Sequence, residues 1–146
     1  MAELKEITLE YKHAIAGHLQ WIQQNQGAIR ILPHVQALYG GTQIDDKIIG
    51  TIVSIAFSNK PFSLDRPIVG FASAEGAVKV SARGTQDLVR RGLNLGKVMK
   101  EVSERFGGTG GGHNIAAGAQ IPAGKEDEFL GSVEEMVAKT VVGVKL

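Results

Sequence analysis

The sequence predicts an α/β fold: one domain in which helices flank a mixed β-sheet of about five strands. Two observations lead to this prediction. Segments with an apolar residue at every third or fourth position, which indicate helices, alternate along the chain with short segments that indicate strands. The 146 residues are enough for one hydrophobic core, and the apolar fraction of 43% is ordinary for a globular protein.

The composition excludes several classes of protein. The absence of cysteine excludes disulfides and thiol-based zinc sites. No apolar run reaches the length of a membrane span, and the amino terminus lacks the basic and then apolar pattern of a secretory signal. We therefore expect a cytoplasmic protein with no membrane partner. Because the net charge is only +1, a site for a polyanion must come from local clustering of basic side chains.

The amino-terminal segment, residues 3–24, predicts an amphipathic helix. Its apolar positions recur in three- and four-residue steps and form one stripe: Leu4, Ile7, Tyr11, Ile15, His18 and Ile22. The sequence Asn25-Gln26-Gly27 is typical of a helix end. We expect residues 1–26 to form a helix that links an upstream domain to the domain formed by residues 27–146.

The next segment contains a strand, a loop and a helix. Residues 28–32 predict a short strand, and residues 35–41 predict a loop that two glycines punctuate. Residues 42–58 predict a second helix, largely buried because its apolar residues form a wide face. Asp45 and Asp46 near its start suit the positive end of the helix dipole. A metal site at this pair of carboxylates is the alternative interpretation.

The clearest local signal is a β-hairpin, with strands over residues 68–74 and 77–83 joined by the turn Glu75-Gly76. Side chains alternate across a strand, so the second strand has one apolar face and one polar face. The polar face carries three side chains in a row: Lys79, Ser81 and Arg83. This face is either a solvated side of the sheet or an anion-binding stripe, in which Arg83 grips a phosphate by two parallel hydrogen bonds.

The carboxy-terminal part predicts two helices and a strand. Residues 94–106 predict a helix that Asn94 caps. Residues 115–121 have strand character, and residues 125–142 predict the last helix.

A glycine-rich stretch, residues 107–113, lies between that helix and that strand. Five of its seven residues are glycine, and each costs about 0.5–1 kcal/mol in a regular helix or strand relative to alanine. We interpret the stretch as a loop that wraps an anion or a flat ring, with His113 as its polar handle. A flexible linker or a tight structural connection is the alternative.

The sequence contains no complete catalytic set. Its aspartates and histidines do not cluster in the way that metal-dependent hydrolysis requires. It has no phosphate-binding loop that ends in Gly-Lys-Ser/Thr and no nucleophile elbow. The glycine stretch follows a helix rather than a strand, which disfavours a dinucleotide fingerprint. We therefore assign no catalytic residue and no metal ligand to this chain.

Three sequence motifs together resemble one known family. Gly110-Gly111-Gly112-His113 followed by Ala116-Ala117-Gly118 is similar to the signature of the C-terminal DHH-associated domain of DHH phosphoesterases. Val80-Ser81-Ala82-Arg83 resembles the family's strand that ends in Ser-x-Arg, and Ile48-Ile49-Gly50 resembles its helix after the first strand. The resemblance covers residues 28–146 and looks closest to archaeal RecJ-like members.

The resemblance implies a nucleic-acid-binding domain. In this family the glycine-rich segment and the strand arginine face the metal site of a catalytic domain and hold its substrate. Matched by position, the implied contact residues are Ser81, Arg83, Gly110, Gly111, Gly112, His113 and Asn114. The implied substrate is single-stranded nucleic acid or a short oligonucleotide. The implied parent protein is a phosphodiesterase or exonuclease that uses Mn²⁺ or Mg²⁺.

The catalytic DHH motif of the family is missing from this sequence. The chain alone should therefore hydrolyse nothing, and the resemblance implies an upstream DHH catalytic domain as its partner. Two other functions stay open: a tRNA-binding or oligomerisation module like that of alanyl-tRNA synthetases, and a protein-interaction module. The sequence does not choose between DNA and RNA, and it leaves a homo-oligomer open.

Overall fold

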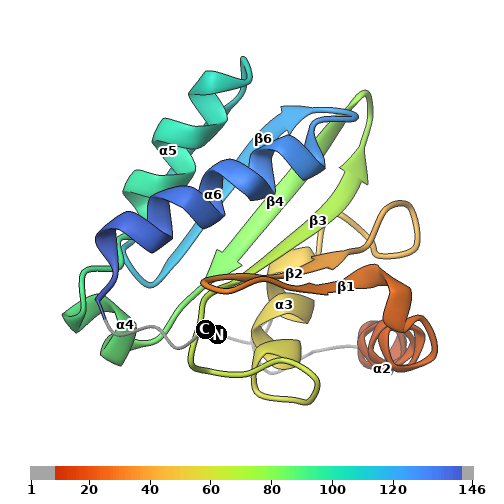
Figure 1. The fold of residues 1–146 in the computed structure, drawn as a ribbon. Coiled ribbons are helices and arrows are strands. Elements are labelled where there is room, and N and C mark those ends of the chain that lie inside the picture. Colours follow the sequence, from red (N-terminus) through yellow and green to blue (C-terminus); the bar gives the residue numbers. More distant parts are fainter. Residues whose placement is uncertain (1–8, 143–146) are drawn as a thin grey trace, which may run out of the picture.

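A computed structural model describes residues 9–142, so residues 1–8 of the expected linker helix lie outside the described part. The chain forms a six-stranded sheet in the order β1-β2-β3-β4-β6-β5, and helices pack on both faces of it (Figure 1). The strands β2 and β3 are parallel, whereas the other neighbours are antiparallel. The expected α/β class with a mixed sheet is confirmed, with six strands in place of about five.

The strands are short at both edges of the sheet and long in its centre. Their bounds are β1 (Ile29–Ile31), β2 (Gln36–Tyr39), β3 (Ile68–Ala74), β4 (Ala77–Arg83), β5 (Thr109–Gly112) and β6 (Ala116–Pro122). The hairpin of β3 and β4 has the bounds that the sequence predicts, and Gly76 in its turn has a φ of 70°. Glycine adopts a positive φ at little energetic cost, so it suits this position in the turn.

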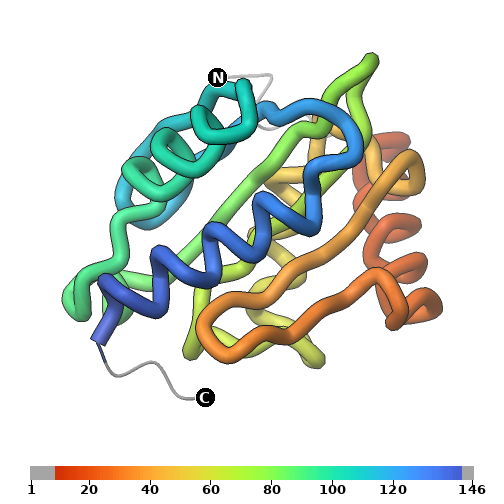
Figure 2. The backbone as a smooth tube through the Cα atoms, turned by 45° about the horizontal axis from the view of Figure 1, so that its top comes forward, coloured from red at the N-terminus to blue at the C-terminus, as the bar shows by residue number. Residues whose placement is uncertain are grey.

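The helices lie in two layers. Their bounds are α2 (Leu9–Gln24), the 3₁₀ turn η1 (Gln26–Ala28), α3 (Ile49–Phe57), α4 (Gln86–Arg90), α5 (Leu95–Arg105) and α6 (Glu126–Thr140). Helices α5 and α6 lie on one face of the sheet, and α2 and α3 lie on the other (Figure 2). None of the helices in residues 9–142 has both the length and the apolar character needed to cross a bilayer.

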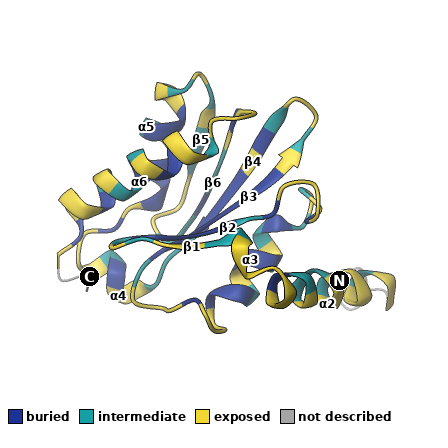
Figure 3. Ribbon diagram, turned by 45° about the vertical axis from the view of Figure 1, so that its right-hand side comes forward, coloured by how far each residue is buried: buried dark blue, intermediate teal, exposed yellow. Residues whose placement is uncertain are grey.

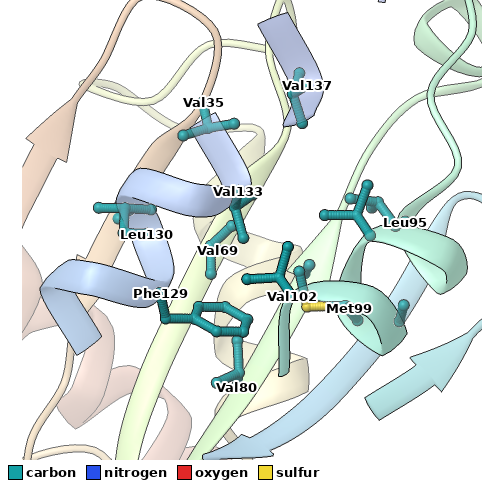
Figure 4. Close-up of a cluster of buried hydrophobic side chains, with 14 of the residues drawn as sticks. Val35, Val69, Val80, Leu95, Met99, Val102, Phe129, Leu130, Val133 and Val137 are labelled. Carbon is teal, nitrogen blue, oxygen red and sulfur yellow. The ribbon is translucent and has the colours of Figure 1, made fainter. Parts of the chain in front are cut away.

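The larger core lies between the sheet and the pair α5–α6. Val69 and Val80 of the sheet meet Phe129 of α6 and Met99 of α5, as Figure 4 shows. All of these side chains are at most 1% exposed. The apolar side of β4 that the alternation predicts is therefore the side that packs on these two helices.

The smaller core lies between the sheet and α3. Ile49 and Val53 of α3 are fully buried, and Gly70 of β3 lets the helix approach, because a Cβ at Gly70 would lie 2.2 Å from Val53 Cγ2. Helix α2 is attached more loosely: Ile22 is its one buried residue in the described range, and most of the helix is exposed or half-buried (Figure 3).

The segment of residues 35–41 contains strand β2, which corrects the loop that the sequence predicts. Val35, Ala37 and Leu38 are fully buried, and β2 pairs with β1 on one side and with β3 on the other. A strand that is covered on both faces needs no alternation of polar and apolar residues. Four residues without alternation, followed by two glycines, therefore resemble a loop in the sequence.

Helix α3 begins at Ile49, seven residues later than the sequence predicts. The preceding residues form turns, and the carboxylate of Asp45 accepts a hydrogen bond from the backbone N–H of Lys47 at 2.9 Å. Aspartate side chains commonly stabilise turns in this way. Asp45 thus serves a turn before the helix and not the first turn of the helix.

The glycine-rich stretch contains strand β5, which corrects the expectation of a loop. Thr109–Gly112 pair with β6 in antiparallel register. Helix α5 packs closely against β5, so Gly110 of this strand has a packing reason to be glycine.

Candidate anion-binding groove

The sheet register brings the polar side of β4 next to bare backbone on β6 and β5. Residues that pair directly across strands lie on the same face of a sheet. Ser81 therefore shares a row with Gly118 of β6 and Gly111 of β5, on the face that carries α3. The neighbouring row begins with Arg83 and continues to Ala116. In these two rows the face is polar on β4 and nearly free of side-chain bulk on β6 and β5.

An open groove of about 430 Å³ lies over this part of the sheet. The segment around the start of α3 forms one wall with Lys47, Gly50 and Thr51. The polar residues of β4 (Lys79, Ser81 and Arg83) and the backbones of β5 and β6 form the rest. A second hollow continues along the sheet past Lys79 toward Thr109, Gln120 and Asp46.

Hydrogen bonds hold the guanidinium of Arg83 at the end of β4. Its Nε donates to Ser54 Oγ at 2.9 Å, and its Nη1 donates to Ser81 Oγ at 3.0 Å and to the carbonyl of Ala82 at 2.8 Å. Its Nη2 is 3.5 Å from the carbonyl oxygen of Gly50, which is a long hydrogen bond. All of these partners are neutral, so the positive charge of Arg83 is hydrogen-bonded but not neutralised.

Arg83 differs from several arginines elsewhere in the domain. Arg30, Arg66 and Arg90 each lie next to an aspartate, whereas no carboxylate in residues 9–142 comes within ion-pair distance of Arg83. Arg83 is half-buried, and burial lowers its pKa because less water solvates the cation. Arginine nevertheless remains charged in proteins. A bound anion would supply the counter-charge that this partly desolvated cation lacks.

Two lysines add to this positive charge. Lys47 and Lys79 are exposed and line the groove, and within the described residues neither forms an ion pair. A carboxylate, that of Asp46, lines the adjoining hollow. The groove therefore carries three cationic side chains although the net charge of the chain is only +1. Local clustering of basic residues is thus present at the place that the polar face of β4 predicts.

The three glycines of β5 have different surroundings. A Cβ at Gly111 would meet no atom within 4 Å, so Gly111 leaves the floor of the groove open. A Cβ at Gly110 would instead lie 2.5 Å from the carbonyl oxygen of Met99 in α5. Gly112 has a φ of 140°, which side chains disfavour. Of the three, Gly111 is the residue whose missing side chain opens the groove, and Gly110 is a packing residue.

His113 and Asn114 stand in the turn between β5 and β6, outside the residues that line the groove. Both side chains are exposed, and their backbone carbonyls accept hydrogen bonds from the first N–H groups of α5: Gly96 donates to His113 O and Leu95 donates to Asn114 O, each at 2.9 Å. His113 lies next to Gly112 at the rim of the groove. The structure thus brings Ser81, Arg83, Gly111 and Gly112 together, but places His113 and Asn114 at the periphery.

The sequence did not indicate the α3 side of the groove. Gly50, Ser54 and the preceding Lys47 become neighbours of Arg83 or of its groove only because α3 packs across β3 and β4. A glycine inside a helix was the available signal, since such a residue usually has a packing or functional reason. The described residues contain no cluster of three or more histidines, aspartates or glutamates that could hold a metal ion.

Comparison with known proteins gives one family. The profile of the DHHA1 domain matches residues 33–139. An uncharacterized protein of Methanocaldococcus jannaschii is 42% identical over 92 residues, which cover 63% of this chain and 20% of that protein. The alanine–tRNA ligase of Geobacillus kaustophilus is 44% identical over 77 residues, which cover 51% of this chain and 9% of the ligase. The chain thus spans a small part of the length of these relatives.

Solved structures share the fold. RecJ of Thermus thermophilus, solved in complex with Mg²⁺, matches with a TM-score of 0.67 and 16% identity over 92% of this chain and 20% of RecJ. The C-Ala domain of the alanyl-tRNA synthetase of Aquifex aeolicus matches with a TM-score of 0.61 and 12% identity over 75% of this chain and 97% of that domain. The same architecture therefore occurs as one part of larger proteins of two kinds.

Proposed function

The chain belongs to the DHHA1 domain family, and we propose that it holds the phosphate groups of single-stranded nucleic acid, or of a short oligonucleotide, in the groove beside Arg83. The observation that carries the proposal is the half-buried guanidinium of Arg83, which opens on a groove and has no carboxylate partner within residues 9–142. Ser81 lines the same groove with a hydroxyl group, and Lys47 and Lys79 supply further positive charge there. Contacts to phosphate position a strand without reading its sequence.

The proposed parent protein is a DHH phosphoesterase of the RecJ-like type. In this proposal a separate catalytic domain holds Mn²⁺ or Mg²⁺, and residues 9–142 contain no group of three or more side chains suited to a metal ion. In this arrangement the present domain binds and orients the substrate and the partner domain cleaves it. The occurrence of the fold as 20% of RecJ supports a role as one part of such an assembly.

The proposal is tested by fluorescence anisotropy with a 5′-phosphorylated hexathymidylate. We expect Arg83→Ala to weaken binding about tenfold, or about 1.4 kcal/mol, because a charge-assisted hydrogen bond to phosphate is lost. Arg90→Ala is the matched control, since Arg90 lies on α4 with an exposed side chain beside Asp87. Thermal unfolding of both variants separates a loss of binding from a loss of folding. Equal affinities of wild type and Arg83→Ala would refute the assignment of the site.

A second candidate function is a tRNA-binding module. The 44% identity to the alanine–tRNA ligase of Geobacillus kaustophilus favours it, as does the shared fold of the C-Ala domain. Competition separates the two functions: folded tRNA would displace the hexathymidylate at lower concentration than a second short strand does if the module is specialised for tRNA. Equal competition per phosphate supports the first proposal.

A further inference from the structure

Arg83 donates a hydrogen bond to a residue outside the groove, Ser54. We infer that Ser54 of α3 is a positioning residue: it holds the Nε edge of the guanidinium against α3, so that Nη2 is presented to the bound phosphate. The inference rests on the proposed function for the phosphate, but the hold on Arg83 is a property of the unliganded domain. Ser54 Oγ accepts from Arg83 Nε at 2.9 Å, and Ser54 is not among the residues that line the groove.

The N–H groups of the guanidinium decide which atoms are left for a ligand. An arginine side chain has five N–H donors. Ser54 takes the one on Nε, and Ser81 Oγ and the carbonyl of Ala82 take the two on Nη1. The contact from Nη2 to Gly50 O is long, at 3.5 Å. An anion in the groove therefore meets Arg83 mainly through Nη2, and a grip by two parallel hydrogen bonds would require one of the shorter bonds to break.

Ser81 provides a second donor beside Nη2. Its oxygen accepts from Nη1 at 3.0 Å, and within residues 9–142 its hydroxyl donates no hydrogen bond. Ser81 is only 6% exposed and lines the groove. The hydroxyl hydrogen of Ser81 and the Nη2 hydrogens of Arg83 thus form a pair of donors that an anion can bridge. This pair exists only while the guanidinium stays against β4.

Gly50 permits the same placement from the other side. A Cβ at Gly50 would lie 2.9 Å from Arg83 Nη2 and 3.2 Å from Ser81 Oγ. The guanidinium therefore lies in the space that a side chain at this helical position would fill. Helix α3 positions Arg83 by two means: the hydroxyl of Ser54 holds Nε, and the bare backbone of Gly50 leaves room for Nη2.

Ser54 does not compete with the ligand for Arg83. A competing hydroxyl would face the groove, where an anion could replace it. Ser54 lies instead one helical turn beyond Gly50, on the Nε side of the guanidinium and outside the groove lining. Loss of its hydroxyl frees Arg83 to leave its place but opens no new contact for the anion. Removal of the hydroxyl should therefore weaken binding and not strengthen it.

The hydrogen bond from Arg83 Nε to Ser54 Oγ, which holds the guanidinium, is tested without any ligand. In ¹⁵N-labelled protein, the Nε–H signal of Arg83, assigned by its disappearance in Arg83→Ala, reports exchange of this hydrogen with water. We expect exchange to become about tenfold faster in Ser54→Ala, because the acceptor is lost, and to return toward the wild-type rate in Ser54→Thr, which keeps a hydroxyl. Ser58→Ala is the matched control, since Ser58 is an exposed serine at the end of α3 with no side-chain hydrogen bond in the described residues.

The consequence for binding is tested with the 5′-phosphorylated hexathymidylate. We expect Ser54→Ala to weaken affinity about threefold to tenfold at an unchanged melting temperature, and Ser54→Thr to restore most of it. Faster exchange with unchanged or tighter binding would overturn the positioning role. Unchanged exchange would overturn the hold itself. If wild type fails to bind, the proposed function fails and the binding role of Ser54 fails with it, while the exchange rates still decide whether Ser54 holds Arg83.

Discussion

Gly110 and Gly111 are neighbours in the sequence, but their surroundings differ: Gly110 is closely packed, whereas Gly111 faces open space. The position of a Cβ at Gly110 is 2.5 Å from Met99 O and 2.8 Å from Ser103 Oγ. These atoms belong to a helix that packs tightly on β5, so the clash cannot be relieved by the rotation of one flexible side chain. The position of a Cβ at Gly111 is open space over the groove. The two residues therefore allow stability and binding to be changed separately.

We expect Gly110→Ala to lower the free energy of unfolding by about 1–3 kcal/mol, the usual cost of overpacking a close contact. Gly111→Ala should leave the free energy of unfolding unchanged or slightly higher, because glycine is a poor strand residue. It should nevertheless weaken hexathymidylate binding severalfold, because its methyl group enters the groove. Urea denaturation and anisotropy measure the two quantities. A Gly111→Ala domain that binds like wild type would mean that ligands do not approach β5.

His113 is a weaker candidate for a ligand contact than Arg83. Its side chain is exposed at the rim, and it is the backbone carbonyl of His113, not the ring, that accepts a hydrogen bond from Gly96 N at 2.9 Å. We expect His113→Ala to weaken hexathymidylate binding by about twofold to threefold, since exposed polar contacts contribute up to about 1 kcal/mol. The melting temperature should not change. A loss as large as that of Arg83→Ala would instead show that the ligand turns toward the β5–β6 turn.

The carboxylate of Glu134 joins helix α6 to the turn between β1 and β2. Glu134 Oε1 accepts from the backbone N–H groups of His34 and Val35 at 2.8 and 3.1 Å, and Glu134 Oε2 lies 2.6 Å from His34 Nδ1. Val35 is fully buried. Because a buried N–H without a partner is costly, this contact fixes the turn between β1 and β2 against α6.

We expect Glu134→Ala to lower the free energy of unfolding by about 1–3 kcal/mol, the cost of leaving such donors unsatisfied. Glu135→Ala is the matched control, because Glu135 is the next residue of the same helix and is exposed. Its effect should stay within about 0.5 kcal/mol. Urea denaturation compares the two. Equal stabilities of the two variants would mean that water replaces the carboxylate at the β1–β2 turn.

The elements with their own local signals were predictable from the sequence. The β3–β4 hairpin has a turn glycine and clear alternation, and Asn94 caps α5 by accepting from Lys97 N at 3.1 Å, as the sequence suggests. Strand β2 is not evident in the sequence because it is buried on both faces and so lacks alternation, and because its parallel partner β3 lies about thirty residues further along the chain. Strand β5 is not evident in the sequence because a run of glycines is typical of a loop, and the packing of α5 against Gly110 is visible only in the structure.

The candidate site was predictable only in part, for a related reason. Alternation along β4 places Ser81 and Arg83 on one face whatever packs against it. The groove itself depends on α3 crossing that face, and on which glycine of β5 points toward it. Both depend on long-range packing. Of the residues that complete the site, Gly50 belongs to a motif of the family resemblance, whereas Lys47 and Ser54 carry no mark in the sequence.

At the scale of the whole molecule, the distribution of charge determines how binding should respond to salt. The net charge of +1 provides little general attraction to a polyanion. Lys47, Lys79 and Arg83 gather on one face, whereas Lys139 lies on α6, on the opposite side of the sheet, and is exposed. Binding should therefore depend on salt through the groove cations alone.

For a single strand, each neutralised phosphate contributes a slope of about −0.7 to the plot of log affinity against log salt, so three contacts predict a slope of about −2. We expect Lys79→Ala to make this slope shallower by about 0.7 and Lys139→Ala to leave it unchanged. Anisotropy titrations of hexathymidylate at several salt concentrations measure it. Equal changes for both lysines would show that the strand samples the whole surface. A slope near zero in the wild type would contradict the recognition of phosphate and favour a protein-interaction module. Contacts between apolar or neutral polar groups depend little on salt, because they involve no charges for salt to screen.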